Sequence, residues 1–134
     1  MTPTNKNSKE LLLPQELETY YILPTLRTAL AIELKAQGKK QTEIANIFGV
    51  TPSAISQYSS KKRGSEVTFP TEIIEIIKQT APKIKDRFTY IKEIQHLLKM
   101  IRSTNTLCQI HHQLNDLPLN CHPQIIGCHS ISQK

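Results

Sequence analysis

A run of small hydrogen-bonding side chains followed by three cations lies near the middle of the chain. The segment from Gln41 to Gly64 reads QTEIANIFGVTPSAISQYSSKKRG, and its uncharged polar side chains include Thr51, Ser53, Ser56, Gln57 and Ser60. A glutamine amide can pair bidentately with adenine, a serine can donate or accept, and a threonine methyl can meet a thymine methyl. Lys61, Lys62 and Arg63 have the chemistry that binds phosphate oxygens. Brought onto one surface, these side chains would suit a DNA duplex.

The residues around these side chains predict two short helices joined by a tight turn. Ala45 is small enough to lie where two helices cross, and Gly49 can adopt a left-handed conformation without a Cβ penalty. Thr51 can cap the second helix, and Pro52 suits its first turn, where no amide donor is lost. These positions match the helix-turn-helix template. The apolar residues expected to pack both helices onto the preceding one are Ile44, Phe48, Val50, Ile55 and Tyr58.

The packing of the second helix decides which of its side chains are exposed. If Ile55 and Tyr58 are buried, the exposed face consists of Ser53, Ser56, Gln57 and Ser60, with Thr51 and Pro52 at its front. The alternative is a generic helical hairpin with a glycine cap, followed by a solvated basic loop. Such a hairpin does not require this outer surface, so the pattern favours DNA contact.

The flanking segments predict further helices and therefore an all-α fold. Helices are expected over about Pro14–Tyr21, Pro24–Gln37 with Gly38 as the stop, and Thr71–Gln79. Asp86 can cap a long helix that carries apolar residues at three- and four-residue steps. Those residues are Phe88, Ile91, Ile94, Leu98 and Ile101. The stripe suits either an ordinary core or pairing with a second copy, and we expect a dimerisation helix.

The resulting organisation has four parts. We expect a disordered polar tail over residues 1–12, a helix-turn-helix DNA-binding domain over 13–66, a helical dimerisation region over 67–106, and a short Cys/His-rich tail over 107–134. The chain has 134 residues, few aromatics and only 4 Gly, which favours an aliphatic helical core. Its formal charge of +6 suits a polyanion.

Other features of the sequence argue against a membrane or a secreted location. No apolar run is long enough to span a bilayer, and the polar start MTPTNKNSKE lacks the apolar core of a signal peptide. The chain has 3 Cys, an odd number that argues against a closed disulfide framework. We therefore expect a cytoplasmic protein with no membrane partner.

The central segment resembles a known family of regulators. QTEIANIFGVTPSAISQYSSKKRG closely resembles the helix-turn-helix of Cro/repressor-type regulators. The preceding YYILPTLRTALAIELKAQG is similar to the archaeal branch of small regulators with that domain, in which a proline-led helix precedes the helix-turn-helix. The resemblance covers about residues 13–64 well and the rest loosely. It implies a five-helix-like DNA-binding domain, a homodimer on an inverted-repeat operator, and transcriptional control, for example as a repressor.

The resemblance also implies roles for individual residues. The base-contacting positions of the family fall on Pro52, Ser53, Ser56 and Gln57. Its phosphate contacts fall near Thr42, Lys61 and Arg63. Members of the archaeal group are similar in carrying a cysteine-rich end, which implies a metal or iron–sulfur site.

The C-terminal residues fit that implication with one departure. The cysteines are Cys108, Cys121 and Cys128, and His111 stands where a C-x-x-C pair would have its second cysteine. A four-thiolate zinc ribbon is therefore disfavoured, and three thiolates with His111 or another fourth ligand remain. On a helix, Cys108 and His111 would share one face and could bind one ion.

Two metals suit this set differently. Zinc would take a closed tetrahedral Cys₃His site and hold the tail together. An iron–sulfur cluster with a weaker fourth ligand would be more labile, which suits a sensor of iron, redox state or metal. We favour the cluster because the rest of the chain resembles a switch. A structural zinc site, or a tail without metal in which Cys108 is a helix-face hydrophobe, are the alternatives.

Two further classes of function compete with a DNA-binding regulator. A non-catalytic protein-interaction module could use the helix-turn-helix only for packing, but it would not need the serine and glutamine face with adjacent cations. An enzyme with Cys108 as nucleophile and a histidine base lacks an evident oxyanion loop and a glycine-rich pocket. We expect that the protein is not an enzyme.

Overall fold

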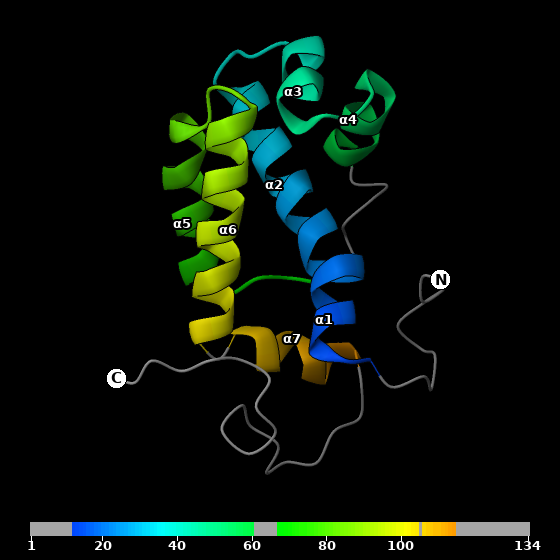
Figure 1. Cartoon of the computed structure of the whole chain (residues 1–134), viewed down its shortest axis with the longest axis vertical. Coiled ribbons are helices and arrows are strands. Elements are labelled where there is room, and N and C mark those ends of the chain that lie inside the picture. Colours follow the sequence, from blue (N-terminus) through cyan, green and yellow to red (C-terminus); the bar gives the residue numbers. More distant parts are fainter. Residues whose placement is uncertain (1–11, 61–66, 105, 115–134) are drawn as a thin grey trace.

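The computed structural model describes residues 12–60, 67–104 and 106–114, and within these ranges every regular element is helical (Figure 1). The helices are α1 Pro14–Leu17, α2 Leu23–Ala36, α3 Gln41–Phe48, α4 Pro52–Ser59, α5 Thr71–Thr80, α6 Arg87–Ser103 and α7 Thr106–Leu114. A π-helical segment, Glu18–Ile22, lies between α1 and α2, and a 3₁₀ turn, Ala81–Lys83, lies between α5 and α6. The predicted all-α fold is confirmed.

The first helices form one continuous rod, where the sequence predicted a break before Pro24. A proline ring clashes with the carbonyl four residues earlier and brings no N–H, so a regular helix cannot pass through it. Here the backbone widens into π geometry, and Leu23 N–H donates to the Glu18 carbonyl. Thr25 Oγ1 donates to the Tyr21 carbonyl at 2.7 Å, which supplies a donor beside the proline. The helix therefore continues.

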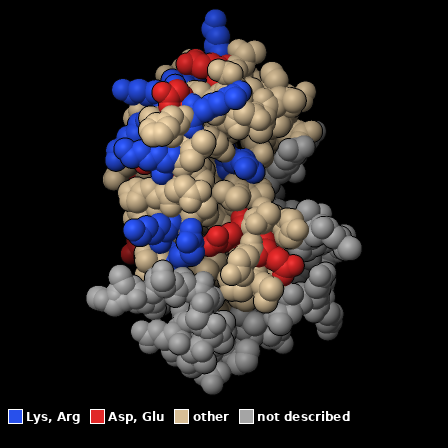
Figure 2. Space-filling model, in the orientation of Figure 1, with Lys and Arg blue, Asp and Glu red and all other residues tan. Residues whose placement is uncertain are grey.

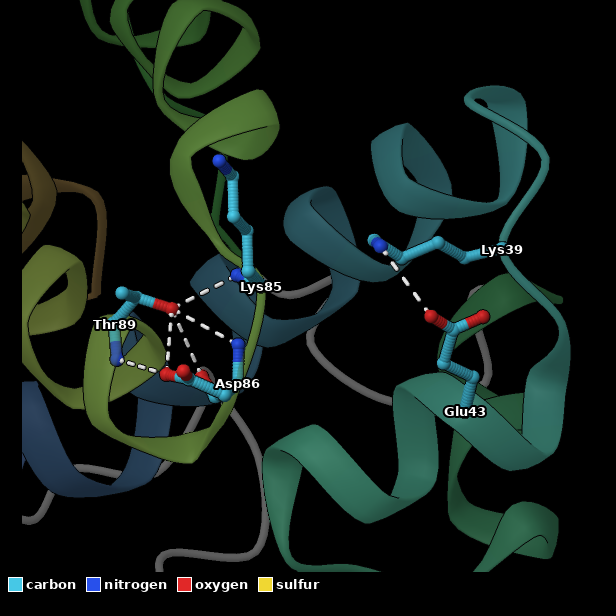
Figure 3. A network of polar contacts seen from close by, with 5 residues as sticks. All are labelled: Lys39, Glu43, Lys85, Asp86 and Thr89. Carbon is cyan, nitrogen blue, oxygen red and sulfur yellow. Dashed lines mark hydrogen bonds and ion pairs between the residues drawn. The ribbon is translucent and has the colours of Figure 1, made fainter.

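Two caps that the sequence predicted are present. Gly38 follows α2 with φ +99°, and its N–H donates to the Lys35 carbonyl at 2.9 Å. Asp86 caps α6, and its carboxylate accepts from Thr89 N–H at 2.8 Å while Thr89 Oγ1 accepts from Asp86 N–H at 3.0 Å (Figure 3). The hydrogen bonds from Thr89 hold the pKa of the Asp86 carboxyl below its usual value.

One apolar core joins the two halves of the chain. Helix α2 lies at its centre and packs against α3, α4 and α5. The second half contributes side chains to the same buried cluster, so residues 67–106 are packed onto the helix-turn-helix and not separate from it. None of the described helices is long and apolar enough to cross a membrane.

The apolar stripe of α6 is divided between the core and the surface. Ile94, Leu98 and Ile101 are buried within this chain. Phe88 and Ile91 are exposed, at 76% and 58% of their full accessible areas. Only the first two turns of α6 therefore present apolar side chains that a second copy could cover without opening the core.

The first part of the expected tail is a helix that belongs to the core. Leu107 and Ile110 of α7 are buried, and α7 packs against α6 and α1. His111 is also buried, and its Nε2 lies 2.9 Å from the carbonyl oxygen of Leu12. Because a carbonyl only accepts, His111 Nε2 donates, and this bond ties the start of the described chain to α7.

Candidate nucleic-acid interface

The turn between α3 and α4 has the backbone geometry that the sequence predicted. Gly49 is left-handed, with φ +70° and ψ 35°. Val50 N–H reaches back to the Ala45 carbonyl at 3.0 Å, which closes the end of α3. Thr51 Oγ1 accepts from Ala54 N–H at 3.2 Å and caps α4, while Pro52 occupies the first position of that helix. Together these contacts set the direction of α4 relative to α3.

Apolar packing then fixes the rotation of α4 about its own axis. Ile55 and Tyr58 are buried, and α4 packs against both α2 and α3. Ala45 is buried as well, in accord with its predicted place between helices. Val50, expected in the core, is only half-buried, whereas Ile47 is buried although the sequence pattern did not single it out. The outward face of α4 follows from these contacts.

That outward face carries the polar residues predicted to contact DNA. Ser53 and Ser56 are exposed, and Gln57 is half-buried between them and the core. Ser60 is exposed, but its Oγ donates to the Gln57 carbonyl at 3.2 Å, which is a C-terminal capping contact. The other predicted positions Thr42, Thr51 and Pro52 are exposed too. Lys61, Lys62 and Arg63 lie outside the described residues.

Two lysines that the sequence reasoning did not select lie at the start of α3. Lys40 is the N-cap residue of α3 and is exposed, and its side chain does not cap the first amides of this helix. Lys39 forms a 3.4 Å ion pair with Glu43 in the first turn (Figure 3). In the sequence, two consecutive lysines immediately before the helix-turn-helix indicate this cationic position.

Lysine and arginine side chains gather over the end of the molecule that carries α3 (Figure 2). In addition to Lys39 and Lys40, this end has exposed cations before and within the first turns of α6. These are Lys83, Lys85, Arg87 and Lys92. The exposed face of α4 has no charged side chain among its described residues, so this face is neutral.

An aromatic and cationic cluster holds α3 against the second half of the chain. The rings of Phe48 and Tyr90 stack with their centroids 4.4 Å apart. Arg27 Nε donates to the Tyr90 hydroxyl at 3.2 Å, and burial raises the pKa of that phenol above its usual value. Arg87 Nε donates to the Asn46 carbonyl at 2.7 Å, near the end of α3. These contacts join residues distant in sequence, and no local pattern revealed them.

The proposed metal ligands are only partly described. Cys108 is half-buried on α7, and His111 lies one turn later on the same helix. Cys121 and Cys128 lie outside the described residues. Within the described ranges, no three His, Cys, Asp or Glu side chains are grouped so that they could hold a metal ion.

The geometry of His111 limits how it could coordinate. Its Nε2 donates to the Leu12 carbonyl, so a metal bond would have to use Nδ1. Metal-binding imidazoles do often donate their other ring N–H to a backbone carbonyl. The same hydrogen bond also has a structural role without any metal, because it satisfies the buried carbonyl of Leu12 and links α1 to α7. Metal binding by Cys108 and His111 therefore stays a prediction.

Comparisons with known proteins identify no related family or structure. The chain matches no protein-family model, and searches of curated proteins and of solved structures returned no significant match. The resemblance to Cro/repressor-type regulators thus depends on the residues of the central segment alone.

Replacing Gly49 tests the turn. A Cβ at Gly49 would meet no atom within 4 Å, so the cost of Gly49→Ala comes from the left-handed backbone alone. We expect Gly49→Ala to lower the free energy of unfolding by about 1–2 kcal/mol. Gly49→Asn should cost less, because asparagine visits this conformation more readily. Urea unfolding followed by circular dichroism measures both, and equal stability of Gly49→Ala and the unaltered protein would contradict the turn geometry.

Purification without oxygen tests the metal prediction. An iron–sulfur cluster should give thiolate-to-iron absorption that is lost in Cys108→Ser, Cys121→Ser and Cys128→Ser. Colourless protein with stoichiometric zinc would support the structural site instead. Metal analysis that finds neither iron nor zinc would remove the sensor hypothesis without affecting the helix-turn-helix.

Proposed function

We propose that this protein binds double-stranded DNA with sequence preference through the exposed face of α4, and that it acts as a transcriptional regulator. The observation that carries the proposal is the uncharged hydrogen-bonding face of α4, on a molecule whose lysines and arginines gather at the end that carries α3. The uncharged side chains of Ser53, Ser56 and Gln57 permit close approach to base edges, while the lysines and arginines at the α3 end would offer charge to the phosphates.

The dimensions of the interface suit a major groove. Helix α4 has eight residues, and its positions 53, 56 and 57 lie along one side, with the C-cap residue Ser60 following. An α-helix fits the major groove of B-DNA, where each base pair presents a distinct pattern of donors and acceptors. Gln57 is the residue best suited to a bidentate contact, because its amide both donates and accepts.

Phosphate contact would use the open end of α3. Its first amides have no side-chain cap, and the positive end of the helix dipole favours an anion there. Thr42 and Lys40 are exposed beside these amides. Gln41 Nε2 donates to the Pro52 carbonyl at 2.8 Å, which holds the starts of α3 and α4 together. The phosphate backbone of one DNA strand could therefore contact the N-terminal ends of both helices.

A homodimer is part of the proposal. Phe88 and Ile91 lie three residues apart near the start of α6 and are the exposed part of the predicted pairing stripe. A two-fold dimer of helix-turn-helix proteins reads two half-sites about 34 Å apart, one turn of the duplex. The DNA bound by such a dimer would contain an inverted repeat.

Selection of bound duplexes from a random library tests this function directly. The unaltered protein should enrich an inverted repeat, and its affinity should fall steeply as salt rises because phosphate contacts release counterions. Gln57→Ala should reduce discrimination at one position of each half-site by about 1–3 kcal/mol, while weak non-specific binding persists.

Gln79→Ala is the matched control, because Gln79 is an exposed glutamine on α5 and not on the helix-turn-helix. It should leave the selected sequence unchanged. An unchanged sequence preference in Gln57→Ala would contradict the assigned orientation of α4. Salt-insensitive binding, or no enrichment of any duplex, would favour a protein-interaction module instead.

A further inference from the structure

A groove lies between α2 and α5 under the segment that follows residue 66. Its volume is about 380 Å³, within the range of pockets that bind small organic molecules. Ala29 and Ile32 of α2 form one wall, and Ile74 and Ile77 of α5 form the other. Phe69 covers one side. The surface that a ligand would meet is therefore mainly apolar.

Part of this apolar surface is accessible to solvent. Ile77 and Phe69 are buried and give the groove a packed base, whereas Ile74 is 41% exposed at its edge. Burying exposed apolar area of this kind releases about 25 cal/mol per Å². A bound apolar group would thus gain free energy without displacing any side chain of the core.

Two of the polar residues that line the groove present acceptors. Glu33 is half-buried in the wall formed by α2, and within the described residues its carboxylate has no ion-pair partner. Thr25 also lines the groove, but its hydroxyl hydrogen is already donated to the Tyr21 carbonyl, so its lone pairs remain for a ligand. A negative group in an apolar wall favours a cation over an anion of the same shape.

We propose that this groove binds a small organic cation with an apolar body, with Glu33 as the partner of its charge. A carboxylate that has no ion-pair partner among the described residues and becomes less solvated on ligand binding favours an opposite charge, and the apolar walls select against strongly hydrated ions such as K⁺ or Mg²⁺. The overall charge of the chain is +6, so attraction to a cation must come from this local site and not from the whole molecule.

The groove is separate from the proposed DNA interface. None of its lining residues belongs to α3 or α4, and α2 lies between the two surfaces as a shared element. A bound cation would contact the side of α2 that carries Ala29 and Glu33 and would leave the exposed residues of α4 unchanged. Ion binding in the groove therefore does not require DNA binding by α4.

Two ions of nearly identical shape and opposite charge test the proposal. Isothermal titration calorimetry of the full chain with tetraphenylphosphonium should show saturable binding near one ion per chain. Tetraphenylborate should bind at least several-fold more weakly, although a protein of charge +6 would attract it non-specifically. Equal affinities for the two ions would overturn the role of Glu33.

Substitutions assign the binding to the groove. Glu33→Gln should weaken tetraphenylphosphonium binding by about three- to tenfold, in the range of a partly exposed ion pair, and should leave tetraphenylborate unaffected or slightly favoured. Glu75→Gln removes an exposed carboxylate of α5 that does not line the groove and should change neither affinity. Binding that is equally sensitive to both substitutions would overturn the proposal.

Filling the groove gives an independent measurement. Ala29→Leu places a larger side chain in the wall and should abolish binding of both ions, with helicity by circular dichroism confirming the fold. Ala36→Leu, on an exposed position of the same helix, should bind as the unaltered chain does. Undiminished ion binding in Ala29→Leu would overturn the proposal. So would a second result: no ion binding to the unaltered chain, together with a dimer that dissociates in Ala29→Leu. That result would identify the groove as a contact between copies.

Discussion

The left-handed backbone of Gly49 decides which side of α4 faces solvent. Because this residue reverses the chain immediately after α3, Thr51 can cap the next helix and Ile55 and Tyr58 can turn toward α2. Ser53 and Ser56 are then on the outer side, with Gln57 half-buried at its edge, because they lie on the opposite side of the helix from Ile55 and Tyr58. The proposed chemistry of the surface is therefore a consequence of one backbone conformation and two buried side chains.

The second half of the chain also holds this arrangement in place. Tyr90 stacks on Phe48 and accepts from Arg27, so a residue of α6 is in contact with side chains of both α3 and α2. Arg87 adds a hydrogen bond to the carbonyl of Asn46. Helix α2 is shared by the core, the helix-turn-helix and the apolar groove. A change that displaces α2 or α6 would therefore move α3 and α4 as well.

Features that depend on local stereochemistry could be predicted from the sequence. Gly49, Thr51 and Asp86 each have a conformational reason for their position, and the exposed face of α4 followed from its apolar partners. Long-range choices could not be predicted. The stripe of α6 looked uniform, yet only contacts with α7 and the other helices determine that Ile94 is buried and Phe88 exposed. The His111–Leu12 bond spans 99 residues of sequence and left no local signal.

Dimethyl sulfate footprinting of a duplex selected by the protein tests the central claim most directly, because the reagent methylates guanine N7 in the major groove and adenine N3 in the minor groove. If the outer face of α4 enters the major groove, bound protein should protect guanine N7 within each half-site, because the groove edge that carries N7 is covered. Adenine N3 should stay reactive there. Protection of adenine N3 alone, or methylation indistinguishable from that of free DNA, would contradict the account.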